Sequence, residues 1–194
     1  MTHAAALSSR RGFLLAAASA GAIAGALATL HSSRAFGAPA MVKIETFNAA
    51  GKSTGVVTVP KIVKSDAQWQ AQLKSDEPLA YQVTRHADTE RPFTGRYAET
   101  HGDGLYRCIC CDTALYDSRT KFESGTGWPS FYAPISKWNV RETSDKSWIM
   151  ARIAISCTRC DAHLGHVFDD GPKPTGLRYC MNSAALRFVP RAAV

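Results

Sequence analysis

The sequence lacks the features that mark several common classes of protein. It has no stripe of lysine and arginine interleaved with aromatic residues, so the net charge of +7 is only weak evidence for nucleic-acid binding. We therefore expect no nucleic-acid partner. It also has no internal repeat and no long amphipathic helical pattern. The 194 residues, 45% of them hydrophobic, are enough for one compact domain and a removable segment.

Acidic residues and lysine are absent from residues 1–40. The Arg10–Arg11 pair lies in a twin-arginine motif, and the uncharged stretch Gly12–Leu30 that follows is rich in alanine and glycine. Small-residue cleavage sites come next, so we predict a twin-arginine signal peptide, export to the periplasm and a mature chain starting near Ala38 or Met41. The alternative is an uncleaved membrane anchor, because the stretch is almost long enough to span a bilayer, although alanine and glycine contribute little to insertion.

Residues 41–64 are predicted to form an N-terminal extension to the domain. Val42–Phe47 alternates apolar and polar residues, a turn follows, and Gly55–Val59 is again strand-like. This pattern predicts a β-hairpin or an extended arm.

Residues 65–191 are predicted to form the main domain. Ser65 and Gln68 match a capping box for a helix that ends near Lys74, and a second short helix is expected from Glu77 towards Arg85. Later segments are short, and the clearest strands are expected at Trp148–Ile155, Leu177–Met181 and Leu186–Val189. The fold class is therefore mainly β, with small antiparallel sheets and short N-terminal helices.

Four of the six cysteines form two Cys-x-x-Cys pairs, Cys108 with Cys111 and Cys157 with Cys160. This spacing lets two sulfurs converge on one ion, and two such pairs complete the tetrahedral shell of a structural zinc. Two alternatives stay open: a disulfide framework, as in many exported proteins, and a thioredoxin-like redox pair at either motif. Zinc is favoured because neither pair begins a helix in a βαβ pattern.

Cys180 is left without a place in these pairs. If residues 177–182 form a strand, Arg178, Cys180 and Asn182 lie on one face, and His163 and His166 lie upstream. A cation beside a thiol favours the thiolate, so we expect a lowered pKa and a nucleophilic sulfur. The alternative is an inert, buried Cys180 in a zinc-knuckle binding module.

Six segments carry a family resemblance: Thr89–Gly95, Tyr106–Cys111, Lys121–Phe131, Cys157–Cys160, His163–Phe168 and Arg178–Ser183. Through them the chain resembles the B-type peptide-methionine sulfoxide reductases, which reduce the R epimer of methionine sulfoxide. The resemblance runs from about Ser65 to Val189. It implies two antiparallel sheets that carry the site, with a structural zinc on the far side.

The resemblance also implies roles for single residues. Cys180 is the expected nucleophile, the side chains around the substrate are His163, His166, Arg178 and Asn182, and Trp128 forms a wall for the methyl group. A histidine can supply a proton to the sulfoxide oxygen near neutral pH. Cys180 then becomes a sulfenic acid, a second thiol condenses with it to a disulfide, and a thioredoxin-like reductant opens that bond.

One position departs from the family pattern. Many members carry the resolving cysteine between the glycines of Ser-Gly-x-Gly-Trp-Pro-Ser, and this chain has Thr126 there. The remaining spare thiol, Cys110, lies between two predicted zinc ligands and is poorly placed to reach Cys180. We therefore favour direct reduction by an external thiol over a loop movement that brings Cys110 across. The expected partners are oxidised proteins and a thiol reductant, and nothing suggests an obligate dimer.

Overall fold

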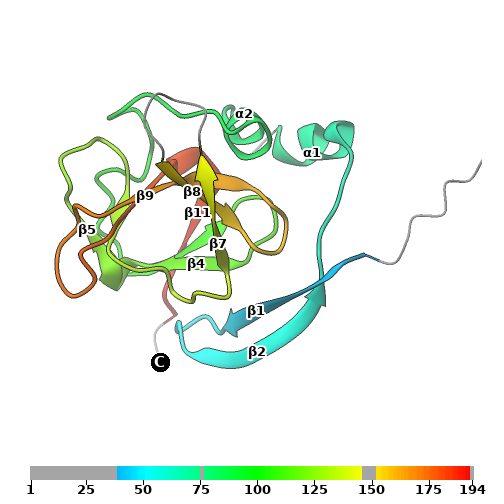
Figure 1. Ribbon diagram of the computed structural model, residues 1–194, viewed down its shortest axis with the longest axis horizontal. Coiled ribbons are helices and arrows are strands. Elements are labelled where there is room, and N and C mark those ends of the chain that lie inside the picture. Colours follow the sequence, from blue (N-terminus) through cyan, green and yellow to red (C-terminus); the bar gives the residue numbers. More distant parts are fainter. Residues whose placement is uncertain (1–38, 75–76, 146–151, 193–194) are drawn as a thin grey trace, which may run out of the picture. The chain divides into compact units, whose positions relative to one another are not determined.

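A computed structural model describes residues 39–74, 77–145 and 152–192. The predicted twin-arginine motif lies outside these ranges. None of the helices within them is long and apolar enough to cross a membrane. The chain runs through β1 (Met41–Phe47), β2 (Ser53–Pro60), α1 (Asp66–Leu73), α2 (Ala80–His86), β3 (Gly104–Cys108), β4 (Ala114–Asp117), η1 (Ser118–Thr120), β5 (Lys121–Phe122), β6 (Ser130–Phe131), β7 (Val140–Asp145), β8 (Arg152–Cys157), β9 (His163–Phe168), β10 (Arg178–Met181), η2 (Ser183–Ala185) and β11 (Leu186–Pro190) (Figure 1).

Both predicted N-terminal helices are present. α1 begins at the predicted capping box, in which the Ser65 hydroxyl accepts from the backbone N–H of Gln68 and the Gln68 side chain accepts from the backbone N–H of Ser65. The helix buries Trp69 and Leu73. α2 begins later than expected, because the residues after Glu77 first form a turn in which the backbone N–H of Ala80 donates to the Glu77 carbonyl at 3.0 Å.

The strands form antiparallel sheets, as the fold-class prediction required. The larger two are a six-stranded sheet in the order β5-β6-β10-β9-β8-β7 and a three-stranded sheet in the order β11-β3-β4. The predicted hairpin pairs β1 with β2 as a separate two-stranded sheet. The strand expected at Trp148–Ile155 is described only from Arg152, where β8 begins, and its first half lies outside the described residues.

Register in the six-stranded sheet aligns residues that are far apart in sequence. Cys180 of β10 lies opposite Ser130 of β6 on one side and opposite His166 of β9 on the other. Directly opposite residues of an antiparallel sheet have side chains on the same face, with Cβ atoms about 5 Å apart. The row Ser130–Cys180–His166 is therefore built by strand pairing.

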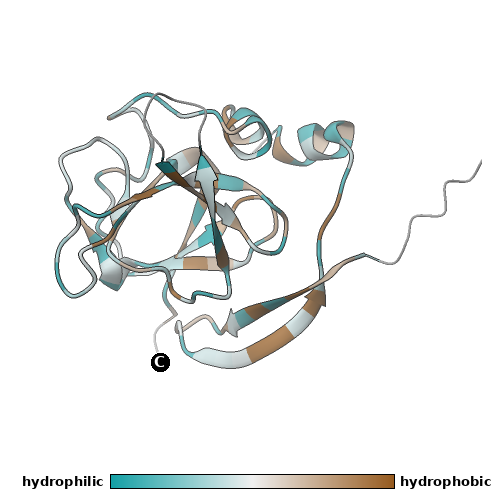
Figure 2. Ribbon diagram, viewed as in Figure 1, coloured by the Kyte–Doolittle hydropathy of each residue, from teal (hydrophilic) through white to brown (hydrophobic). Residues whose placement is uncertain are grey.

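Aromatic side chains pack the two larger sheets together. Tyr116 of β4 stacks on Phe131 of β6 with ring centroids 4.4 Å apart, and its hydroxyl donates to the sulfur of Met181 at 3.1 Å. All three side chains are fully buried. In contrast, Figure 2 shows a hydrophobic band on β2, where Val56 and Val57 are exposed.

A buried asparagine ties the hairpin to the three-stranded sheet. Asn139 accepts from the backbone N–H of Glu45 at 2.7 Å and donates to the carbonyls of Glu45 and Ala114, both at 2.8 Å. Its side chain is wholly inaccessible to solvent. The predicted N-terminal extension is thus anchored to the domain by hydrogen bonds as well as by the buried Ile44.

Candidate functional site

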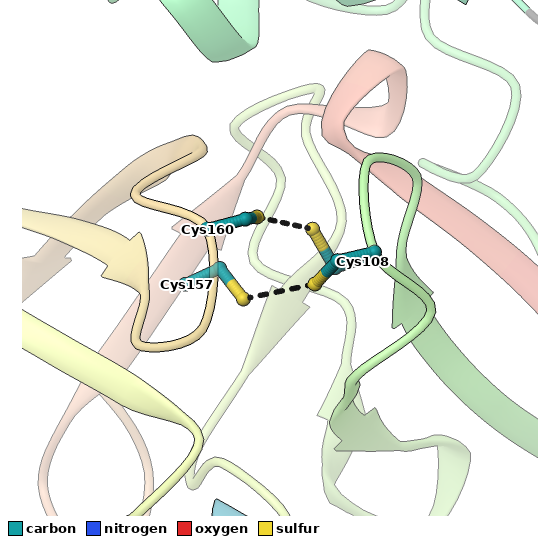
Figure 3. A group of neighbouring side chains, drawn as sticks. Cys108, Cys157 and Cys160 are labelled. Carbon is teal, nitrogen blue, oxygen red and sulfur yellow. Dashed lines mark hydrogen bonds between the residues drawn. The ribbon is translucent and has the colours of Figure 1, made fainter. Parts of the chain in front are cut away.

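The two Cys-x-x-Cys pairs lie on matching loops. One follows β3 and the other follows β8. Asp112 and Asp161, which come directly after the pairs, have left-handed φ angles of 61° and 57°. Their backbone N–H groups donate to the carbonyls of Cys108 and Cys157 at 2.8 and 2.9 Å. Figure 3 shows the sulfurs of the labelled cysteines pointing toward one another from the two loops.

The four sulfurs have the spacing of a metal site. All lie within 4.8 Å of one another, with Cys108 and Cys160 3.7 Å apart and Cys111 and Cys157 3.5 Å apart. A disulfide bond is about 2.05 Å long, and all six cysteines are free, so these sulfurs are not bonded to each other. A tetrahedron with metal–sulfur bonds of about 2.3 Å has edges of about 3.8 Å. The cluster can therefore hold a metal ion, and its donor set suits structural zinc.

Cys180 lies apart from this cluster, in a pocket of about 220 Å³. Its side chain is half-buried. The other lining residues are Thr89, Trp128, Arg152, Gly165, His166, Phe168, Met181 and Asn182. Gly165 permits this packing, because a Cβ atom there would come within 2.2 Å of the Cys180 carbonyl oxygen. Three of the predicted site residues, Trp128, His166 and Asn182, therefore share the pocket with Cys180.

The pKa of the Cys180 thiol is raised above its usual value, chiefly because burial penalises the thiolate. A hydrogen bond from Thr126, the charge of Arg178 and a hydrogen bond from Ser130 lower the pKa, but by less. The expected lowering of this pKa is therefore wrong for the unliganded protein. Arg178 acts in the expected direction, but its guanidinium is already engaged by Asp170 through two hydrogen bonds of 2.8 Å.

The two histidines differ in their position relative to Cys180. His166 lies opposite Cys180, and its Nε2 is 2.9 Å from the Asp145 carboxylate. His163 lines a neighbouring cavity that also contains Asp145 and His166, and it does not line the Cys180 pocket. The rings of His163 and His166 contact edge to face, with centroids 5.3 Å apart.

Neither histidine is cationic at neutral pH in the unliganded protein. Burial, followed by the charge of His166, lowers the pKa of His163 to about 4. Burial also lowers the pKa of His166, although its hydrogen bond with Asp145 opposes the shift. A neutral His166 must carry its proton on Nε2 to donate to Asp145, which leaves Nδ1 as a proton acceptor.

Glu90 connects two of the predicted site residues, and the sequence analysis gave it no role. Its backbone N–H donates to the Asn182 side chain, and its carbonyl accepts from the Trp128 indole, each at 3.0 Å. Its buried carboxylate accepts from the backbone N–H groups of Ser183 at 2.5 Å and Ala184 at 3.0 Å. The backbone of Glu90 therefore holds the Trp128 indole and the Asn182 amide in place.

The remaining predicted residues are placed as follows. The Arg178 guanidinium lies 4.3 Å from the centre of the Phe168 ring. Asn182 also donates to the Leu164 carbonyl at 3.2 Å. Cys110 is buried, and its carbonyl accepts from Gln72 at 2.7 Å. The Cys110 side chain adjoins those of Cys108 and Cys160, so the spare thiol lies against the four-cysteine cluster as expected.

Comparison with known proteins gives a consistent assignment. The model of the SelR domain family matches residues 77–190. The peptide methionine sulfoxide reductase MsrB of Herminiimonas arsenicoxydans is 55% identical over 128 residues, which are 66% of this chain and 91% of that protein. The MsrB of Pseudomonas putida (strain W619) is 57% identical over 131 residues, 68% of this chain and 96% of that protein. The MsrB of Hahella chejuensis is 55% identical over 128 residues, 66% of this chain and 90% of that protein.

Proposed function

This chain belongs to the MsrB family of peptide methionine sulfoxide reductases, and we propose that it returns methionine-(R)-sulfoxide in oxidised proteins to methionine through Cys180. Its enzyme class is peptide-methionine (R)-S-oxide reductase. One observation carries the assignment of roles. Cys180 shares a pocket with an indole, an imidazole and a carboxamide, while four other cysteines gather in a separate cluster.

The pocket suits a methyl sulfoxide chemically. The methyl and thioether portion is soft and apolar, so it favours the faces of Trp128 and Phe168. The sulfoxide oxygen is a hydrogen-bond acceptor, and the Asn182 amide carries a second Nδ2–H beyond the one that it gives to Leu164. Glu90 fixes both the indole and the amide, which supports a site that is organised before the substrate arrives.

The proton that the oxygen needs is already in the resting site. The thiol holds it, because the pKa of Cys180 is raised, and the neutral His166 offers an acceptor nitrogen. In the proposed reaction the proton passes from Cys180 to His166 as the sulfur attacks the sulfoxide sulfur, and His166 then donates it to the oxygen. Asp145 stabilises the transient imidazolium. The sulfur–sulfur bond made in the attack then breaks as the protonated oxygen passes from the methionine sulfur to the Cys180 sulfur. Cys180 becomes a sulfenic acid, the methionine sulfur gains two electrons, and the Cys180 sulfur loses them.

An external thiol regenerates the enzyme in this proposal. It attacks the sulfenic acid, water leaves and a mixed disulfide forms; a second thiol then releases Cys180. Thr126 cannot form a disulfide, and Cys110 is buried against the metal cluster. The reductant is a thioredoxin-like protein or a small thiol. In this proposal zinc in the four-cysteine cluster is structural, and the enzyme acts as a monomer. The twin-arginine motif supports a periplasmic location.

The decisive experiment is an epimer-resolved assay with dithiothreitol as the reductant. The protein should consume methionine-(R)-sulfoxide and leave the S epimer, and Cys180→Ser should abolish turnover while its zinc content stays normal. Cys110→Ser serves as the matched control, because it removes a thiol without touching the pocket. Turnover by Cys180→Ser would end the proposal, and inactivity of the native protein on both epimers would favour a zinc-knuckle binding module.

A further inference from the structure

Thr126 contacts the sulfur that is proposed to react. Its hydroxyl oxygen lies 3.8 Å from the Cys180 Sγ, within hydrogen-bond reach for sulfur. The flanking Gly125 and Gly127 have φ angles of 72° and 87°, which residues other than glycine rarely adopt. These two left-handed residues bend the loop tightly around Thr126. The position is therefore shaped to hold a side chain against Cys180.

Two further hydroxyl groups stand behind this contact. The Ser124 hydroxyl lies 2.8 Å from the Thr126 hydroxyl and 2.7 Å from the Ser130 hydroxyl. Ser130 is the cross-strand partner of Cys180, so its hydroxyl lies on the same face of the sheet, and it lowers the pKa of that thiol. The Ser130 hydroxyl also donates to the Trp128 carbonyl at 3.2 Å. The four side chains are therefore arranged as a ring: hydrogen-bond contacts link Cys180 to Thr126, Thr126 to Ser124 and Ser124 to Ser130, and strand pairing places Ser130 beside Cys180. The ring lies within the described residues and needs no water to complete it.

We propose that Ser124, Thr126 and Ser130 form a hydroxyl ring that stabilises the negative charge on Cys180 when its proton leaves, with Thr126 as a further catalytic residue. The inference rests on the proposed function, since it assigns a role in that reaction. The ring transfers no atom and no electron. It changes only which oxygen or sulfur atom donates each hydrogen bond.

Rotation of hydroxyl protons lets the ring serve both charge states. A hydroxyl can donate or accept, so the Cys180 thiol can donate into the ring while its proton is present. Once the sulfur is anionic, Thr126 can turn to donate to it, and Ser130 can do so by leaving the Trp128 carbonyl, while Ser124 still has an oxygen neighbour on each side. Hydrogen bonds to a charged group are about twice as strong as neutral ones. The ring therefore favours the thiolate more than the thiol.

The other groups around Cys180 do not replace this role. Arg178 lies on the same strand and is held by Asp170. His166 faces Cys180 from β9 and hydrogen-bonds Asp145, and Arg152 of β8 lines the same pocket and is paired with Asp145 at 3.1 Å. Each charged group thus has its own counter-charge or partner. The hydroxyls of Thr126 and Ser130 are neutral donors that need no compensation.

The ring also gives a reason for threonine at this position. A cysteine in place of Thr126 would capture the sulfenic acid as a disulfide. A hydroxyl group cannot form that bond, but it can donate to the oxidised sulfur or its oxygen. The sulfenic acid then persists until an external thiol arrives, in line with the regeneration route proposed above.

The test compares Thr126→Val, which keeps the shape and removes the hydroxyl, with Thr126→Ser, which keeps the hydroxyl. The pH dependence of alkylation of Cys180 by iodoacetamide, with the site identified by mass spectrometry, reports the pKa of the thiol. Loss of one hydrogen bond to the thiolate should raise this pKa by about 1 unit in Thr126→Val. Thr126→Ser should keep the native value. Thr58→Val, an equivalent change on an exposed strand of the hairpin, is the matched control.

Two results would refute the proposed role of the hydroxyl ring. One is an unchanged alkylation pKa in Thr126→Val, and the other is an equal rise in Thr126→Ser, which would point to a steric cause. If Thr126→Val does not fold with a normal zinc content, Thr126→Ala gives the same comparison. Alkylation does not depend on turnover, so a native protein that fails to reduce methionine-(R)-sulfoxide would refute the proposed function separately.

Discussion

Replacement of Glu90 by alanine should destabilise the protein more than most substitutions outside its aromatic core. The Glu90 carboxylate is buried and accepts two backbone hydrogen bonds from the start of η2, where Ser183 and Ala184 are 2% and 1% exposed. Alanine at this position would leave both N–H groups without an acceptor and without access to water. Each buried, unsatisfied donor costs about 1–3 kcal/mol.

The expected loss in the free energy of unfolding is about 3 kcal/mol, since relief from burying a carboxylate offsets part of the cost of the two donors. That is a large share of the roughly 5–15 kcal/mol that stabilises a typical domain. The carboxylate also fixes the segment whose backbone holds Trp128 and Asn182, so its loss should let that segment shift and raise the KM for methionine-(R)-sulfoxide.

The stability of the Glu90 variants relative to the native protein should also change with pH in one direction, which a general packing defect would not produce. Burial raises the pKa of Glu90 above its unfolded value, outweighing the lowering by its hydrogen bonds to Ser183 and Ala184. A raised acid pKa contributes stability that is fully present below the unfolded pKa and is lost as pH rises through the folded pKa. The native protein should therefore gain stability relative to Glu90→Gln as the pH falls from 7 towards 4.

Urea unfolding of the zinc-loaded proteins, followed by circular dichroism, measures these differences. Glu90→Gln keeps one acceptor oxygen, so at pH 7 it should lose less stability than Glu90→Ala. Glu99→Ala, at an exposed position, is the matched control for removal of a carboxylate. A loss below about 1 kcal/mol in Glu90→Ala, which is within the range for a single ordinary hydrogen bond, would refute the reasoning. So would a native advantage over Glu90→Gln that shrinks as the pH falls.

Three further predictions concern the thiols and the hairpin. Thr126→Cys should form an internal disulfide with Cys180 after one turnover without reductant, because the Thr126 oxygen is already 3.8 Å from the sulfur; mass spectrometry that finds only a free sulfenic acid would contradict this. Removal of zinc by a chelator should lower the melting temperature by more than about 10 °C, since four buried or half-buried sulfurs lose the ion that they share. Calorimetry with and without added zinc measures this change, and an unchanged transition would disprove a structural metal. Asn139→Ala should cost about 3 kcal/mol, from three lost hydrogen bonds at a fully buried site, and urea unfolding should show it, whereas a cost as small as that of the surface variant Asn48→Ala would not fit.

Features that depend on neighbouring residues in the chain were predictable from the sequence. The capping box at Ser65 and Gln68 requires only a spacing of three residues, and it is present in the structure. The hairpin and the two Cys-x-x-Cys loops are likewise local patterns. The alternation within Leu177–Met181 placed Arg178 and Cys180 on one face, and the charge of Arg178 does lower the pKa of Cys180, as expected for neighbours on that face.

Features that depend on strand pairing and burial were not predictable. Cys180 and Ser130 are 50 positions apart in the chain, and only the register of β10 with β6 makes them neighbours. Glu90 reads as part of an exposed, polar Thr-Glu-Arg segment, and nothing in its spacing indicates that its carboxylate binds η2. The sign of the Cys180 pKa shift failed for the same reason. The sequence shows that Arg178 lies near Cys180 in the chain, but the burial of the thiol depends on every element packed around it.

The direction of these pKa shifts bears on how a reactive thiol could survive in the oxidising periplasm that we propose for this protein. With the pKa of Cys180 raised and that of His166 lowered, the pair rests as a neutral thiol and a neutral imidazole. Thiolates, not thiols, are alkylated and oxidised readily, so the resting sulfur is protected until its proton has a final acceptor. A bound sulfoxide supplies that acceptor in its oxygen, and the thiol proton can then leave by way of His166. In the proposed reaction the nucleophile therefore forms only when its substrate is present, and the hydroxyl ring around Thr126 supports the charge at that moment.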